Sequence, residues 1–89
     1  MSIVDILAAK LAEDTMKAMD ELGEERLYTE VGGILATSSQ SLEEAYMTEV
    51  RVRLAERLAR QFLVNKVKNA RAEKKAAKPT APARPDGQA

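Results

Sequence analysis

The sequence predicts an all-α fold, in which two long amphipathic helices are joined by a short third helix and followed by a disordered C-terminal tail. Apolar residues recur at helical spacing in the first 22 residues and again through the middle of the chain, while the last 14 residues contain all three prolines. We therefore expect a helical domain over residues 1–75 and a Lys-, Ala- and Pro-rich tail over residues 76–89.

The first predicted helix begins after Ser2 and ends near Leu22. Ser2 is a suitable N-cap, with Asp5 at the third helical position, and Gly23 allows the left-handed turn that commonly ends a helix. On a helical wheel the apolar residues form one arc, whose centre comprises Val4, Leu7, Leu11, Ala18 and Leu22. This arc is flanked by Ala8, Thr15 and Met19. We expect this arc to face the core.

Residues 24–37 allow two interpretations. Leu27, Val31, Ile34 and Leu35 have helical spacing, which favours a short helix, although Gly32-Gly33 would cost about 1 kcal/mol per glycine relative to alanine. The same residues could form a hairpin with a two-residue turn at the glycines. A lone hairpin is marginally stable, and we favour the helix.

The long helix is expected to begin at Ser41, where Ser41 and Glu44 form a capping box, and to end near Ala72. Its apolar row recurs every four residues, at Tyr46, Val50, Leu54, Leu58 and Phe62. Because a turn holds 3.6 residues, this row winds around the helix, and Met47, Ala55, Ala59 and Leu63 widen it. Such breadth indicates contact with more than one helix.

A second copy of the chain is the expected partner of the long helix. About 75 residues make a small core, and the absence of Cys leaves oligomerisation as the available support. The candidate interface comprises Tyr46, Val50, Arg51, Leu54, Leu58 and Phe62. Arg51 interrupts this apolar face, either as a long side chain that reaches solvent or as an ion-pair partner of an acidic residue on another chain or on the first helix.

Charge is distributed unevenly, although the whole chain is neutral. Residues 1–49 carry eleven acidic and three basic side chains, whereas residues 57–89 carry nine basic and two acidic ones. Candidate contacts to phosphate or to an acidic partner are Lys66, Lys68, Arg71, Lys74, Lys75 and Lys78. The alternative is a solvated tail that confers solubility. This stretch lacks aromatic side chains that could stack on nucleic-acid bases.

No residue pattern indicates catalysis. The chain lacks Cys and His, and Ser38, Ser39 and Ser41 are explained by helix capping. We expect no cofactor, no metal site, no small-molecule substrate and no membrane attachment, and a cytoplasmic location. The leading hypothesis is a non-enzymatic protein–protein interaction or assembly module that forms a homodimer; the alternative is a nucleic-acid-associated protein whose basic C-terminal arm contacts phosphate without sequence specificity.

Overall fold

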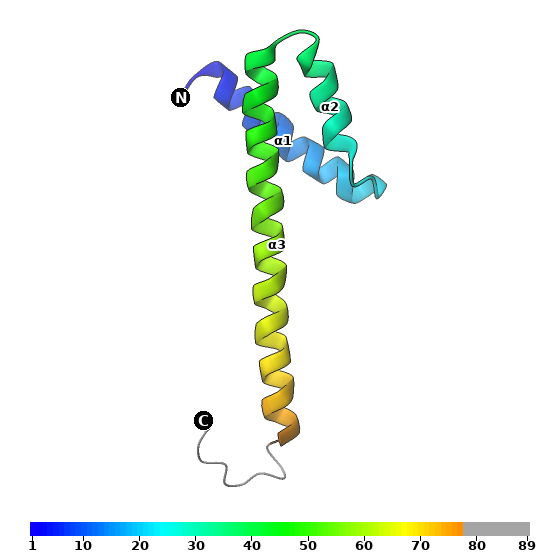
Figure 1. Cartoon of the computed structure of the whole chain (residues 1–89), viewed down its shortest axis with the longest axis vertical. Helices are drawn as coiled ribbons and strands as arrows, with labels where there is room; N and C mark the ends of the chain where they lie inside the picture. The colour runs from blue at the N-terminus through cyan, green and yellow to red at the C-terminus, as the bar shows by residue number, and fades with distance from the viewer. Residues whose placement is uncertain (78–89) are drawn as a thin grey trace. The chain divides into compact units, whose positions relative to one another are not determined.

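The computed structural model describes residues 1–77, which form the three helices of Figure 1: α1 (Ile3–Leu22), α2 (Leu27–Ala36) and α3 (Gln40–Ala77). The described residues contain no strand, so the all-α prediction is confirmed and the hairpin alternative for residues 24–37 is wrong. The chain divides into two compact units within α3, residues 1–56 and residues 57 onward.

The predicted ends of α1 are confirmed. The Ser2 hydroxyl accepts a hydrogen bond from the Asp5 backbone N–H at 3.1 Å, which satisfies one of the unpaired donors of the first turn. Gly23 has a φ of 70°, in the left-handed region that suits glycine, and its N–H donates to the Met19 carbonyl at 2.9 Å.

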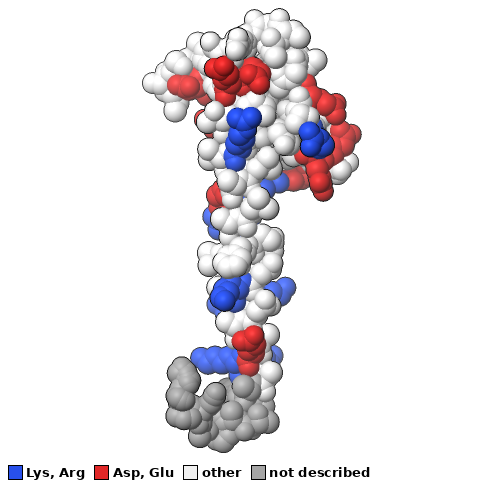
Figure 2. Space-filling model, viewed as in Figure 1, with Lys and Arg blue, Asp and Glu red and all other residues white. Residues whose placement is uncertain are grey.

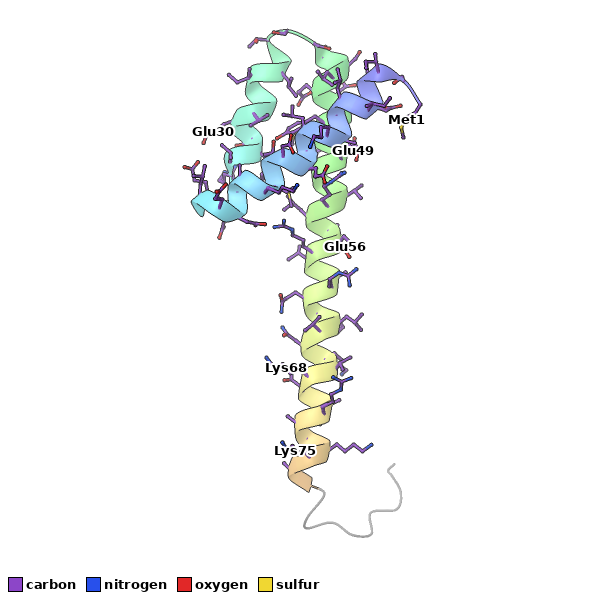
Figure 3. The ribbon with its side chains drawn as sticks, turned by 180° about the vertical axis from the view of Figure 1, so that it is seen from behind. Met1, Glu30, Glu49, Glu56, Lys68 and Lys75 are labelled. Atoms are coloured by element: carbon purple, nitrogen blue, oxygen red, sulfur yellow. The ribbon has the colours of Figure 1, made fainter. Side chains whose placement is uncertain are left out.

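The core of the first unit lies where α1 crosses the beginning of α3 (Figures 1 and 3). Tyr46 and Val50 of α3 are completely buried, as are Ala8 and Ala12 of α1. The small alanines let the two helices approach closely enough for the tyrosine and valine to fill the space between them. Apolar side chains of α2 pack against the same cluster, including Leu27, Val31 and Leu35.

The face of α1 that the sequence predicts to be buried differs from the face that is buried in the structure. The buried residues are Ala8, Ala12, Thr15, Met16 and Met19, whereas Leu7 and Leu22 at the centre of the predicted arc are exposed. The apolar arc of α1 is wider than one contact, and close packing of small residues against α3, rather than summed hydrophobicity, selects the part that is buried. Leu7 and Leu22 therefore face solvent, whereas Leu11 between them is partly buried and packs against the core.

The two adjacent glycines of α2 have different surroundings. A Cβ added at Gly32 would lie 3.1 Å from the Met47 sulfur and 3.7 Å from a ring carbon of Tyr46. A Cβ added at Gly33 would have no atom within 4 Å. Gly32 thus permits a close approach between α2 and α3, whereas Gly33 faces open space.

The N-cap of α3 is Ser39 rather than the predicted Ser41. The Ser39 hydroxyl accepts from the Leu42 N–H at 3.1 Å, and its carbonyl accepts from the Glu43 N–H at 3.0 Å. Ser41 already lies in the first turn, so the predicted Ser41–Glu44 capping box does not form. The sequence offers several adjacent cap-forming residues, and in the structure Ser39 is the one that caps the helix.

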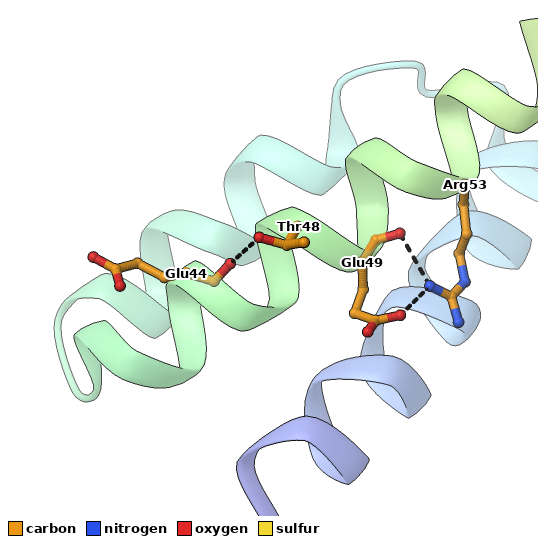
Figure 4. A network of polar contacts seen from close by, with 4 residues as sticks. All are labelled: Glu44, Thr48, Glu49 and Arg53. Atoms are coloured by element: carbon orange, nitrogen blue, oxygen red, sulfur yellow. Dashed lines mark hydrogen bonds and ion pairs between the residues drawn. The ribbon is translucent and has the colours of Figure 1, made fainter. Parts of the chain in front are cut away.

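The following turns of α3 are held by local polar contacts, shown in Figure 4. The Thr48 hydroxyl donates to the Glu44 carbonyl at 3.0 Å, and one Arg53 nitrogen donates to both the backbone carbonyl and the carboxylate of Glu49, at 3.0 and 2.6 Å. This Glu49–Arg53 ion pair has i,i+4 spacing and joins successive turns of one helix.

The helix α3 extends to Ala77, five residues beyond its predicted end near Ala72. Lys74 and Lys75 in its last turn interact favourably with the negative end of the helix dipole, and alanines continue the helix without penalty. The predicted tail begins at residue 76, and apart from its first two residues it lies outside the described part of the chain. The predicted domain boundary at residue 75 stays a prediction.

Candidate interaction site

The row of residues predicted as an interface falls into two parts. Tyr46 and Val50 are completely buried within the first unit, and Leu54 is half-buried and packs against the same core. In this fold Tyr46 and Val50 have no surface to offer a partner. They act as the contact between α3 and the other two helices of their own unit.

Arg51 is exposed on the surface of the first unit. Among residues 1–77 the structure shows no ion pair between Arg51 and α1, so the intramolecular form of the predicted pair is absent. Its pairing with an acidic residue of another chain stays a prediction.

The second part of the row is exposed and belongs to the second unit. Leu58 is 75 % exposed and Phe62 is 68 % exposed, and Leu63 is 57 % exposed beside them. With Ala59, these side chains occupy an arc of about 140° on the helix, counting 100° per residue. We call Leu58, Ala59, Phe62 and Leu63 the 58–63 face. Ala59 and Leu63 were recognised in the sequence only as residues that widen the stripe.

A basic face lies on the opposite side of the same helical segment. Lys68, Arg71 and Lys75 are exposed and fall within an arc of about 60° that is centred roughly opposite the 58–63 face. Figure 3 marks Lys68 and Lys75 along this segment. Lys66 differs from them, because it lies within the arc of the 58–63 face, and Lys74 lies at the edge of that arc. Lys78, the last predicted contact, lies outside the described residues.

Acidic side chains gather on the first unit. Figure 2 shows them over α1, α2 and the start of α3, while the visible surface of residues 57–77 carries mostly basic side chains. At the turn between α1 and α2 the exposed carboxylates are Glu21, Glu24 and Glu25. Each unit thus presents one predominant sign of charge to a partner.

The exposed carboxylates of α1 include one that is bonded to a lysine. The Lys10 ammonium donates to Asp14 Oδ1 at 3.1 Å, and this hydrogen bond, with the charges of Asp14 and Glu13, raises the pKa of Lys10. Both side chains are well exposed, so the pair has the properties of an ordinary i,i+4 surface ion pair.

Two kinds of site are absent from the residues that the structure describes. Within residues 1–77 there is no group of three or more Asp, Glu, His or Cys side chains placed to hold a metal ion. No helix of this part of the chain combines the length and apolar character needed to cross a bilayer.

Comparisons with protein-family models, with curated protein sequences and with solved structures find no match to this chain.

Proposed function

We propose that this chain is a non-enzymatic protein–protein interaction or assembly module that forms a homodimer through the 58–63 face of α3. One observation carries the proposal: three large apolar side chains, Leu58, Phe62 and Leu63, are more than half exposed on one side of a regular helix. Contiguous exposed apolar surface of this kind marks interaction sites in soluble proteins. The absence of Cys is compatible with the reducing cytoplasm, which we propose as its location.

A second copy is favoured as the partner because a chain of 89 residues has a small core and gains support from association. Its core contains only two large, completely buried side chains, Tyr46 and Val50. Domains of this size bury a smaller fraction of their surface than large ones, and oligomerisation is a common source of additional stability. A two-fold dimer contains two copies of each side chain of the 58–63 face, and both copies become buried.

The test compares two pairs of substitutions that add the same charge on opposite sides of α3. Leu58→Glu with Phe62→Glu places two carboxylates on the 58–63 face, and Gln61→Glu with Val64→Glu places two on the other side. We expect the first pair to leave a monomer in sedimentation velocity at micromolar concentration and the second pair to retain the dimer. Equal behaviour of the two variants would contradict the assignment of the interface to this face.

A second candidate function is nonspecific nucleic-acid association, supported by the exposed basic face of Lys68, Arg71 and Lys75. It predicts binding to duplex DNA or RNA that weakens steeply between about 50 and 200 mM salt. It also predicts loss of binding when the chain is cut at Ala72, which removes two lysines of the last helical turn together with the predicted tail. Retention of nucleic acid by the shortened chain at low salt would count against an arm that includes the tail.

A further inference from the structure

The side of α3 that bears the 58–63 face carries little charge. Within residues 57–76, most basic side chains lie in an arc of about 80° on the other side of the helix: Arg57, Arg60, Lys68, Arg71 and Lys75. The arc of the 58–63 face contains one lysine and one glutamate of this segment, Lys66 and Glu73, and Lys74 lies at its edge. Two copies of the segment can therefore meet through this face with most of their basic side chains on the outside.

Lys66 and Glu73 have no partner of opposite charge within reach on their own helix. Side chains three and four positions apart are neighbours on a helix. The residues at these distances from Lys66 or Glu73 along α3 are all uncharged: Phe62, Leu63, Asn69, Ala70, Ala76 and Ala77. In the part of the chain that the structure describes, neither Lys66 nor Glu73 forms an ion pair. Two opposite charges, about 10 Å apart along the helix, thus stand ready for a partner of complementary charge.

The positions of these two charges select the direction in which a second copy can pair. Lys66 and Glu73 each lie within about 10° of the middle of the arc, so both face a helix that packs there. In a parallel pair each residue lies level with its own copy, and lysine would face lysine and glutamate would face glutamate. Like charges at such short range repel each other. An antiparallel pair separates the like charges and sets each lysine near a glutamate of the other copy.

The sizes of the side chains on this side of α3 agree with an antiparallel pair. The three large side chains of the 58–63 face lie in the first half of the segment, and each is more than half exposed. The second half carries small side chains in the same arc, Ala70 and Ala76, which are also exposed. Antiparallel pairing sets large side chains against small ones, which is how facing helix surfaces interlock.

We propose that residues 57–77 of two copies pair antiparallel, about a two-fold axis level with residue 68, and this inference rests on the homodimer proposed above. Lys66 of each copy then differs by about 4.5 Å in height from Glu73 of the other, a gap that the two side chains span. Leu58 and Phe62 lie against Ala76 of the other copy. The two-fold axis forms each contact twice, because every residue of the face occurs in both copies.

The first test is a charge exchange in the full chain, read as the dimer dissociation constant by sedimentation velocity. Lys66→Glu and Glu73→Lys are each expected to weaken the dimer by at least about tenfold, because each sets like charges against each other twice. The two substitutions together exchange the charges and are expected to restore the constant to within about threefold. Lys68→Glu makes the same change in net charge as Lys66→Glu on the opposite side of α3 and is expected to alter the constant by less than about threefold.

The second test is disulfide cross-linking of single-cysteine variants, which the absence of native Cys allows. Asn69→Cys places two thiols about 3 Å apart in height beside the two-fold axis, and it is expected to form a covalent dimer under mild oxidation. Ala59→Cys places them about 27 Å apart, beyond the reach of a disulfide. A parallel pair, or a pair in which the two 58–63 faces meet each other, would instead join Ala59→Cys. Cross-linking of Ala59→Cys, or failure of Asn69→Cys to cross-link, would overturn the alignment.

Circular dichroism establishes that each variant remains helical, which is expected because all the substituted positions are exposed. A dimer that Leu58→Glu with Phe62→Glu disrupts, but that Lys66→Glu and Glu73→Lys leave unchanged, would overturn the reciprocal pairing of Lys66 with Glu73 while leaving the proposed function intact. A monomer for the unchanged chain would overturn both.

Discussion

The Tyr46 hydroxyl of α3 donates a hydrogen bond to the Tyr28 backbone carbonyl of α2, with an O···O distance of 3.1 Å. Tyr46 is completely buried between the helices of the first unit, and its phenol is the polar end of an otherwise apolar contact. Burial raises the pKa of Tyr46 because it disfavours the phenolate, although a hydrogen bond with Thr15 acts in the opposite direction. This residue links the packing of the unit to its stability at high pH.

The first prediction concerns the pH dependence of stability. The folded pKa of Tyr46 lies above the ordinary tyrosine value of about 10, so its contribution is fully present below that pH and is lost as pH rises through the folded pKa. Tyr46→Phe is expected to lower the free energy of unfolding by about 1 kcal/mol at neutral pH, through loss of the hydrogen bond. It is also expected to reduce the fall in stability above pH 10.

Urea unfolding at a series of pH values between 7 and 11 measures both effects. Lys10, whose pKa is also raised by its hydrogen bond to Asp14, is present in both proteins, so its contribution cancels in the comparison. Parallel pH profiles for the two proteins would show that Tyr46 does not titrate from a buried position.

The second prediction distinguishes the two serines at the start of α3. Ser39→Ala is expected to lower the free energy of unfolding by about 1 kcal/mol, because it removes the acceptor for the Leu42 N–H. Ser41→Ala is expected to change it by less than about 0.5 kcal/mol, because Ser41 lies inside the helix and alanine is a better helix former. Denaturant unfolding measures the free energy of unfolding of both variants. A larger loss for Ser41→Ala than for Ser39→Ala would favour the capping box at Ser41.

The third prediction uses the two glycines of α2 as a matched pair. Gly33→Ala is expected to raise the free energy of unfolding by about 0.5–1 kcal/mol, since a methyl group there meets open space and alanine favours a helix. Gly32→Ala has the same backbone advantage but sets its methyl group 3.1 Å from the Met47 sulfur. Thermal unfolding is expected to rank Gly33→Ala above Gly32→Ala. Equal gains would show that Met47 moves aside without cost.

The fourth prediction tests which side of α1 is buried. Met16→Ala is expected to cost about 2–5 kcal/mol, because Met16 is buried in the core. Leu7→Ala is expected to cost less than about 1 kcal/mol in the stability of a single chain, because Leu7 is half exposed. Denaturant unfolding below the concentration at which the chain dimerises measures both values. A larger cost at Leu7 would support the face expected from the sequence.

The sequence was sufficient to predict the features that depend on local chemistry. Ser2, Gly23 and the Glu49–Arg53 pair lie where the rules for caps and i,i+4 contacts place them. The choice of a helix for residues 27–36 was also correct, because four apolar residues at helical spacing outweighed two glycines.

Features that depend on tertiary packing could not be predicted in the same way. The buried side of α1 depends on how closely Ala8 and Ala12 let α3 approach, and the apolar arc of the sequence was too wide to indicate that choice. The apolar row of α3 was recognised, but its division into buried Tyr46 and Val50 and exposed Leu58 and Phe62 depends on where the other two helices end. Tyr46 and Val50 therefore leave the candidate interface, and the interface role of the remaining residues stays a prediction.

The measurement that tests the central proposal most directly is the mass of the unchanged 9.8 kDa chain by sedimentation equilibrium across nanomolar to micromolar concentrations. The proposal predicts a monomer at the lowest concentrations and a mass of about twice the monomer at the highest. A single monomeric mass throughout this range would contradict the assembly function and, with it, the role of the 58–63 face.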